Sequence, residues 1–182
     1  MAPMDISQAG KGREPALVAL FTATFTASEG AAEGALIGDL VRRLLADTPA
    51  SDRYVFTAEA GGTIVGGAIF SRLIYDREAR TVFVLGPVAV ATERQGEGIG
   101  QRLLSHGLKT LGDAGVDVAM TYGDPGYYAR IGFAPISEAF APAPFPLQHP
   151  EGWLAQSLTG AEMTPLQGKA RCVAALDDPV FW

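Results

Sequence analysis

The stretch that decides the fold reads Arg94-Gln95-Gly96-Glu97-Gly98-Ile99-Gly100-Gln101-Arg102, and it follows an extended apolar run over residues 81–90. Three glycines at alternate positions allow a tight turn and a close approach of the backbone to a ligand. The pattern predicts a helix directly after the turn. Because a helix N-terminus presents unpaired N–H groups and the positive end of its dipole, this arrangement favours a phosphate or pyrophosphate.

The spacing of the glycines excludes two common phosphate-binding motifs. A P-loop needs Gly-Lys-Ser or Gly-Lys-Thr at its end, and no such pair directly follows these glycines. A dinucleotide fingerprint that starts at Gly96 and Gly98 needs a third glycine where Gln101 stands. Taken alone, the segment is either a pyrophosphate site of another kind or a strand-to-helix turn without a ligand.

Two motifs together indicate a family. Gln95-x-x-Gly98-x-Gly100 resembles the pyrophosphate-binding signature of the GNAT acetyltransferase superfamily. Further along, after a short apolar strand over residues 116–122, Tyr128-Ala129-Arg130-Ile131-Gly132-Phe133 resembles the Tyr-x-x-x-Gly-Phe ending that closes the coenzyme site in that family. The resemblance covers residues 54–136 closely and the remainder loosely. The Gly-Asp-Pro-x-Tyr-Tyr form at residues 123–128 is similar to that of small bacterial members.

The resemblance implies a fold and a domain organisation. We expect an α/β (α+β) protein with a central, mixed, mostly antiparallel sheet that is splayed at the coenzyme site and flanked by helices. A single domain would span residues 1–182. Its coenzyme-binding core would lie at about residues 54–136, and residues 137–182 would complete the sheet and the acceptor side. GNAT domains often dimerise, so the resemblance also makes a homodimer possible.

The activity that the resemblance implies is acyl-CoA-dependent N-acyl transfer. Acetyl-CoA would be the co-substrate, and a primary amine, on a small molecule or a protein, would attack it directly through a tetrahedral intermediate. The alternative is a catalytically silent acyl-CoA-binding domain that senses the coenzyme or serves a partner. The presence of Tyr128 and of the intact turn favours the enzyme.

The same resemblance assigns site residues. Tyr128 is the expected catalytic residue, which protonates or hydrogen-bonds the departing thiolate. A free phenol has a pKa near 10 and a free thiol one near 8.5, so full proton transfer would need a lowered phenol pKa. No general base is assigned, because none of the candidate carboxylates, Glu29, Glu33, Glu93 and Asp124, stands out by spacing. The expected coenzyme-binding residues are Val88, Ala89, Val90, Arg94, Gln95, Gly96, Glu97, Gly98, Ile99, Gly100, Gln101, Arg102, Tyr128 and Arg130.

The resemblance also implies that the backbone N–H groups of Val88 and Val90 hydrogen-bond the pantetheine arm, with the Val90 amide nearest the acyl oxygen. The Gly86-Pro87 pair suits a local break in strand pairing, since proline donates no ladder hydrogen bond. Arg94 and Arg102 are candidates for phosphate contacts or ordinary surface charges.

Composition limits the partners. The formal net charge of −6 argues against a nucleic-acid binder, which normally presents a basic face. No apolar run reaches the length needed to cross a bilayer, and no secretory leader opens the chain, so we expect a cytoplasmic protein without a membrane partner. No metal-ligand spacing is present. The single cysteine, Cys172, lies in an apolar stretch and is expected to be a buried strand residue.

Periodicity predicts the remaining elements. The Pro-rich segment 141–150 is either a connecting arm over the surface or a wall of the acceptor pocket, with Phe140, Phe145 and Trp153 as aromatic surface. The predicted helices span residues 14–26, 31–46 and about 98–114; the predicted strands span residues 4–8, 54–60, 63–72, 84–90, 116–122, 153–158 and 169–176.

Overall fold

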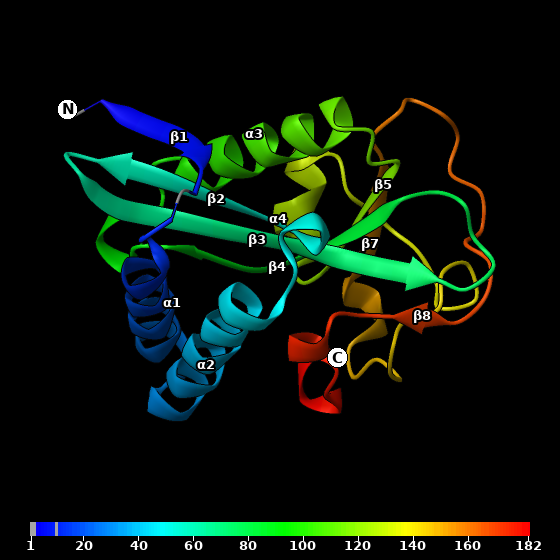
Figure 1. Ribbon diagram of the computed structural model, residues 1–182, viewed down its shortest axis with the longest axis horizontal. Coiled ribbons are helices and arrows are strands. Elements are labelled where there is room, and N and C mark those ends of the chain that lie inside the picture. Colours follow the sequence, from blue (N-terminus) through cyan, green and yellow to red (C-terminus); the bar gives the residue numbers. More distant parts are fainter. Residues whose placement is uncertain (1–2, 10) are drawn as a thin grey trace. The chain divides into compact units, whose positions relative to one another are not determined.

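The structure, a computed structural model, describes residues 3–9 and 11–182. Its strands form one mixed sheet in the order β1-β2-β3-β4-β5-β7-β6, with β8 paired to β3 (Figure 1). The strands are β1 (Met4–Gln8), β2 (Arg53–Ala60), β3 (Thr63–Tyr75), β4 (Val82–Val90), β5 (Val118–Tyr122), β6 (Ala134–Pro135), β7 (Trp153–Ser157) and β8 (Ala170–Arg171). The helices are α1 (Glu14–Glu29), α2 (Ala31–Asp47), α3 (Ile99–Asp113) and α4 (Pro125–Tyr128). The predicted fold class is confirmed.

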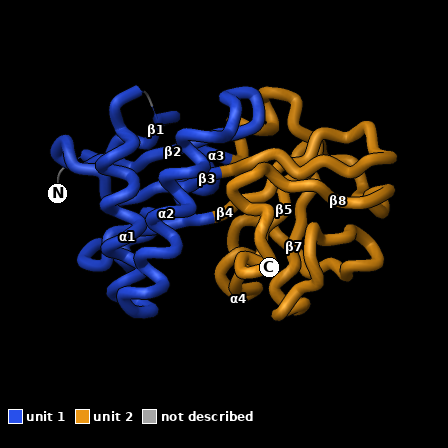
Figure 2. The backbone as a smooth tube through the Cα atoms, turned by 60° about the horizontal axis from the view of Figure 1, so that its bottom comes forward, with its two compact units in different colours: residues 1–69, 87–107 blue, residues 70–86, 108–182 orange. Residues whose placement is uncertain are grey.

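The chain divides into two compact units. The first contains residues 1–69 and 87–107, and the second contains residues 70–86 and 108–182 (Figure 2). β3, β4 and α3 each continue from one unit into the other.

Adjacent glycines on β3 fix the layers of the first unit. A Cβ on Gly67 would lie 2.9 Å from the ring of Phe21 in α1. A Cβ on Gly66 would lie 3.3 Å from Ile99 and 3.4 Å from Leu103 in α3. Because neighbouring residues of a strand point to opposite faces, α1 covers one face of β3 and the start of α3 covers the other (Figure 1). Both helices approach the strand closely where it has no side chains.

Two glycines also bring α1 and α2 together. A Cβ on Gly34 would lie 2.8 Å from the carbonyl oxygen of Thr22 and would overlap the Thr26 hydroxyl. A Cβ on Gly38 would overlap the Thr22 hydroxyl. Gly30, with φ of 99°, forms the turn between the two helices. The Gly-x-x-x-Gly spacing on α2 therefore permits a close helix pair.

Aromatic side chains form the core of the second unit. Trp153 is fully buried, and its indole N–H donates to the Ala141 carbonyl at 2.8 Å. Trp182 packs edge-on against Trp153 at 6.0 Å between ring centroids and donates to the Leu176 carbonyl at 2.9 Å. The Pro-rich segment thus supplies a backbone acceptor to a buried indole. Since Trp153 is buried, it adds no aromatic surface to an acceptor pocket.

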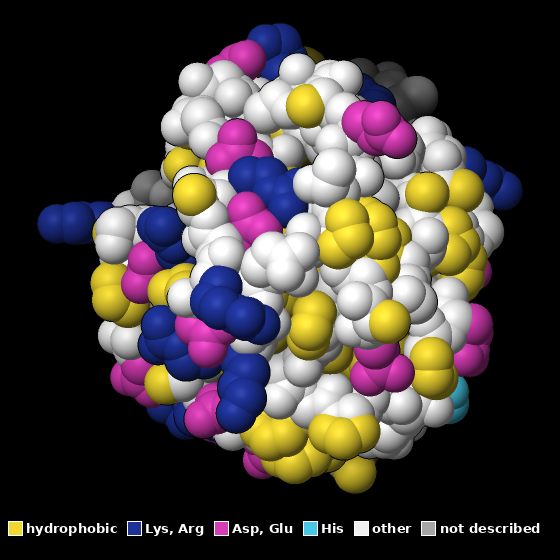
Figure 3. Space-filling model, turned by 90° about the vertical axis from the view of Figure 1, so that its right-hand side faces the viewer, with side chains coloured by type: hydrophobic (Ala, Val, Ile, Leu, Met, Phe, Trp, Pro, Cys, Tyr) yellow, Lys and Arg dark blue, Asp and Glu magenta, His cyan; other side chains and the backbone are white. Residues whose placement is uncertain are grey.

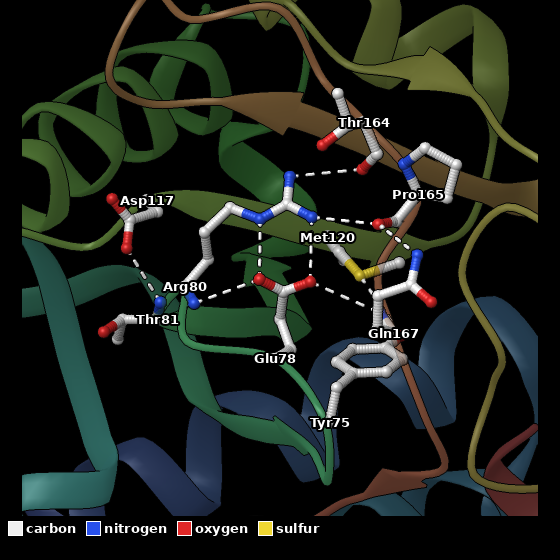
Figure 4. Close-up of polar contacts among 9 residues, drawn as sticks. All are labelled: Tyr75, Glu78, Arg80, Thr81, Asp117, Met120, Thr164, Pro165 and Gln167. Atoms are coloured by element: carbon white, nitrogen blue, oxygen red, sulfur yellow. Dashed lines mark hydrogen bonds and ion pairs between the residues drawn. The ribbon is translucent and has the colours of Figure 1, made fainter.

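The loop between β3 and β4 is tied to the C-terminal part of the chain (Figure 4). The Arg80 guanidinium donates to both carboxylate oxygens of Glu78, at 2.9 and 2.8 Å. It also donates to the carbonyl oxygens of Thr164 and Pro165 at 3.1 and 3.0 Å. The Gln167 N–H donates to Glu78 at 3.2 Å. The hydrogen bond from Arg80 is the main reason why the Glu78 pKa falls to about 2.

One predicted strand is wrong in extent. Residues 153–158 were expected to form a strand, and β7 confirms it, but of residues 169–176 only Ala170–Arg171 pair, with the end of β3. The apolar run beyond them forms a 3-10 helix, Ala174–Leu176, which buries Ala175 and Leu176. The apolar residues that suggested a strand are therefore buried by a helical turn. Cys172 lies between these elements and is only partly buried, so its predicted place in a buried strand is also wrong.

The surface mixes both signs of charge on the face drawn in Figure 3, where acidic and basic side chains are interspersed. Within residues 3–9 and 11–182, no helix combines the length and the apolar character needed to cross a membrane.

Candidate functional site

The glycine-rich turn lies in the first unit, directly before α3. Gly96 and Gly98 have φ of 83° and 79°, a backbone conformation that side chains other than glycine rarely adopt. A Cβ at either position would meet no atom of the described protein within 4 Å. Glycine is therefore required here by the backbone, and the outer side of the turn is open.

The first turn of α3 presents donors at this opening. The first intrahelical bond joins the Arg102 N–H to the Gly98 carbonyl at 3.2 Å. The N–H groups of residues 99–101 come before it and have no carbonyl of the helix as a partner. The Ile99 side chain is buried and anchors this end of the helix. The turn and the helix end together suit an anionic group.

The charges around the turn partly cancel. The Arg94 Nε–H donates to both carboxylate oxygens of Glu97, at 3.1 and 2.9 Å. The hydrogen bond to Glu97 raises the pKa of Arg94, so the pair stays ionised. The Arg102 side chain is exposed. In this structure the Arg94 Nε is engaged by a carboxylate within the same turn, and its contact with phosphate stays a prediction.

Gln95 connects the turn to the end of β4. Its side-chain N–H donates to the Val90 carbonyl at 3.0 Å, and the Thr24 hydroxyl of α1 lies 3.5 Å from the same oxygen. The Ala91 N–H donates to the Val65 carbonyl of β3 at 2.8 Å. These contacts fix the position of the turn relative to the second half of β4, which carries Val88, Ala89 and Val90.

In the second unit, β4 and β5 pair in parallel over a short length. The register runs from Val82 opposite Val118 to Leu85 opposite Thr121. At that last pair the Thr121 hydroxyl, which is buried, donates to the Leu85 carbonyl at 3.0 Å. β4 continues past this point through Gly86. The parallel pairing therefore ends directly before the Gly86-Pro87 pair, where the sequence predicted a break.

Tyr128 is held at the end of the short helix α4. The Asp124 carboxylate caps this helix by accepting from the Gly126 N–H at 2.9 Å, and the Tyr128 N–H donates to the Asp124 carbonyl at 3.1 Å. The Tyr128 ring lies against Gly123, where a Cβ would be 2.7 Å away, and edge-on to Phe133 at 5.8 Å. Gly123 is thus the position that lets the ring approach the end of β5.

The Tyr128 hydroxyl is held neutral. Burial raises its pKa to about 12, and the nearby Tyr127 and Asp124 act in the same direction. A hydrogen bond with the Thr121 side chain acts against them. A lowered Tyr128 pKa is therefore not found in this structure; the phenol is neutral at ordinary pH.

A pocket of about 350 Å³ opens beside the start of α4. Tyr122, Asp124, His149 and Glu151 contribute to its lining. The His149 ring lies 3.7 Å from the Glu151 carboxylate, and the His149 N–H donates to the Tyr122 hydroxyl at 2.6 Å. The end of the Pro-rich segment therefore borders a pocket next to the helix that carries Tyr128.

The predicted site residues fall into two groups. Residues 88–90 and 94–102 lie together in the first unit, and Tyr128 and Arg130 lie in the second. Arg130 is exposed on a 3-10 helix that follows α4. Sequence reasoning missed Thr121 and Thr24. The available signal for Thr121 was a single threonine within an apolar segment, whereas Thr24 lies among other threonines of α1 and offered no such signal. Among the described residues, no cluster of His, Cys, Asp or Glu could hold a metal ion.

Comparisons with known proteins agree with this arrangement. A family model described as an acetyltransferase (GNAT) domain matches residues 51–135. An uncharacterised N-acetyltransferase of Escherichia coli K12, YjhQ, is 36% identical over 137 residues, which are 72% of this chain and 75% of the relative.

Two solved structures share the fold. A GNAT-family acetyltransferase from Brucella melitensis in complex with acetyl-CoA has a TM-score of 0.76 and 26% identity, over 97% of this chain and 100% of that one. The E. coli N-acetyltransferase YhbS in complex with CoA has a TM-score of 0.84 and 20% identity, over 98% and 94% of the two chains.

Proposed function

The chain belongs to the GNAT acetyltransferase family, and from this premise we propose that it transfers the acetyl group of acetyl-CoA to a primary amine. The observation that carries the proposal is the turn before α3. Its two glycines have positive φ, their outer side is open, and the N–H groups that follow them have no carbonyl of the helix as a partner. A solved relative with 26% identity binds acetyl-CoA, which supports the same co-substrate here.

We assign the coenzyme pyrophosphate to the N–H groups of residues 96–102. Gln95 would position the turn, because its hydrogen bond to the Val90 carbonyl holds the turn against the end of β4. The backbone of Val88 and Val90 would bind the pantetheine arm and polarise the acyl carbonyl. A preorganised donor of this kind can lower the barrier by roughly 3 kcal/mol.

Tyr128 would stabilise the departing thiolate as a neutral donor. Full transfer of its proton to a thiol of pKa near 8.5 from a phenol of pKa about 12 would be uphill by about 3.5 units, or roughly 5 kcal/mol. A charge-assisted hydrogen bond to the sulfur has no such cost. The proton would then pass fully only if contacts in the reacting complex stabilise the phenolate.

The first test is the thermal midpoint with and without acetyl-CoA. At a ligand concentration of 100 times Kd, binding adds about 2.7 kcal/mol to the free energy of unfolding. For a protein of this length the midpoint should rise by about 5–11 °C. Adenosine and inorganic phosphate serve as controls and should leave it unchanged. Absence of a rise with acetyl-CoA and with longer acyl-CoAs would refute the coenzyme site.

Turnover separates the enzyme from a silent binder. Thiol release from acetyl-CoA is measured with polyamines, aminoglycosides and lysine as acceptors. An enzyme with Tyr128→Phe should lose turnover and keep its affinity for acetyl-CoA. A thermal shift without thiol release for any acceptor would instead support the binding domain.

A further inference from the structure

The pocket of about 350 Å³ beside the start of α4 lies at the carboxyl end of β5. Tyr122 and Gly123 line it, and they directly follow Thr121, the last residue of β5 in the parallel register with β4. Gly123 also lies against the ring of Tyr128, since a Cβ on this glycine would be 2.7 Å from that ring. The pocket and the proposed catalytic tyrosine therefore share one residue.

Packing fixes the walls of this pocket. The Gly123 N–H donates to the Gly152 carbonyl at 2.9 Å, and a Cβ on Gly152 would lie 2.8 Å from the Gly123 carbonyl oxygen. The Tyr122 ring stacks on Trp182 and meets Trp153 edge-on, both at 6.4 Å between ring centroids. Because the walls are already ordered, a ligand that enters the pocket pays little for arranging them.

The charges that line the pocket are negative. Asp124 and Glu151 contribute carboxylates, and of the described residues that line the pocket none is a lysine or an arginine. The Asp124 carboxylate is oriented by the Gly126 N–H, which donates to it at 2.9 Å, and an ionised carboxylate can accept from further donors. His149, whose ring lies 3.7 Å from Glu151, carries a positive charge only when it is protonated. The pocket therefore suits a cation.

The cation that fits best is not the nitrogen that reacts. An attacking amine must be neutral, whereas a nearby carboxylate favours the charged form of an amine. An alkyl ammonium group has a pKa near 10.4 and stays charged at neutral pH. The two carboxylates therefore match a second ammonium group that takes no part in the reaction, and the Tyr122 ring adds an aromatic surface that attracts such groups.

We propose that this pocket binds a second, non-reacting ammonium group of the acceptor, so that the preferred acceptors are aliphatic diamines and longer polyamines. The inference rests on the acetyl transfer proposed above and specifies its acceptor. Asp124 and Glu151 determine specificity: they strengthen the binding of a dicationic amine and do not act on the nitrogen that receives the acetyl group.

The first experiment compares 1,4-diaminobutane with 1-aminobutane as acceptors for the full chain, by thiol release from saturating acetyl-CoA. The two amines have the same carbon chain and differ in the second ammonium group. At low salt we expect the KM for the diamine to be at least about fivefold lower, which exceeds the factor of about two that two equivalent ends supply. The difference should shrink at high salt. Equal KM values at low salt would overturn the inference.

Two isosteric substitutions then remove the charges. Asp124→Asn retains a side chain that caps helices equally well, and Glu151→Gln retains the length of the side chain. The double variant should raise the KM for 1,4-diaminobutane about five- to tenfold and leave its kcat, and the KM for 1-aminobutane, within about twofold. The control is Glu162→Gln, which removes an exposed carboxylate outside the pocket and should change neither KM. An unchanged KM for the diamine, or an equal rise for both amines, would contradict the assigned role.

An NMR titration of the native protein needs no turnover. The Gly126 N–H donates to the Asp124 carboxylate and therefore reports on it. We expect 1,4-diaminobutane to shift the Gly126 amide resonance, with coenzyme A absent or saturating, and 1-aminobutane at the same concentration to shift it less than half as far. No shift with the diamine in either state would refute this inference alone. Protein that binds acetyl-CoA but releases no thiol with either amine would refute the proposed function, and the Gly126 shift would still decide whether the pocket binds a second cation.

Discussion

Gly98 provides the sharpest test of the phosphate site, because two substitutions separate backbone strain from charge. Its φ of 79° penalises any side chain, but Asn and Asp tolerate this region better than other residues. The space around an added Cβ is open, so neither would clash with the described protein. Gly98→Asn and Gly98→Asp therefore share strain and size and differ in charge.

The magnitude follows from Coulomb's law. A carboxylate at about 5 Å from a pyrophosphate of charge near −2 is repelled by roughly 1.7 kcal/mol in water, and by more where the solvent is partly excluded. Strain common to both variants should cost roughly 1–2 kcal/mol of stability. We expect Gly98→Asp to bind acetyl-CoA about 10- to 100-fold more weakly than Gly98→Asn.

Isothermal titration calorimetry measures the two Kd values at low and high salt. The ratio between Asp and Asn should fall at high salt, because screening acts on the charge and not on the strain. Thermal midpoints without ligand should be lowered equally in both variants, which controls for folding. Equal Kd values for the two variants at low salt would show that no phosphate binds at this turn.

Three further substitutions test other parts of the structure. Glu97→Gln should tighten acetyl-CoA binding severalfold at low salt, because it removes a carboxylate from the turn and releases Arg94. The control is Asp113→Asn, which removes a carboxylate paired with Lys109 at the far end of α3 and should leave the Kd for acetyl-CoA unchanged. The Glu78 carboxyl has a folded pKa of about 2, below its ordinary value, so its contribution to stability is present above about pH 4.5 and is lost as pH falls toward 2. Between pH 7 and pH 3, native protein should lose about 1–2 kcal/mol more stability in urea titrations than Glu78→Gln, and parallel curves would contradict the assigned ion pair. Gly34→Ala should lower the free energy of unfolding by roughly 1–3 kcal/mol, because the added Cβ would meet the Thr22 carbonyl. The control, Ala27→Gly at an exposed position of α1, should lower it by about 1 kcal/mol or less. Similar losses for the two variants would mean that α1 and α2 are not closely packed at Gly34.

Local patterns in the sequence predicted the main elements. The apolar spacing of α1, α2 and α3 and the glycine turn between β2 and β3 correspond to helices and strands in the structure. Gly96 and Gly98 were expected to form a special turn, and both have positive φ. These features depend on backbone conformation and on short-range periodicity, which neighbouring residues determine.

The same local reasoning failed at the C-terminus. The apolar residues before Asp177 have the composition of a strand, but β8 pairs only with the end of β3, at Ile74 and Tyr75. The residues after β8 bury their side chains in a 3-10 turn instead. An apolar composition predicts that a segment is buried. It does not predict the conformation of the buried segment, because that depends on which parts of the chain pack against it.

The sequence by itself thus determined the family and the glycine turn, because their residue types and spacing are local and specific; Tyr128 as a catalytic residue stays a prediction. Only the tertiary structure showed that Glu97 engages Arg94, that Gln95 holds the end of β4, and that Thr121 donates to the Leu85 carbonyl at the end of the parallel register. The last contact joins residues on β4 and β5. Such a contact depends on strand register, which is not encoded in the spacing of any single segment.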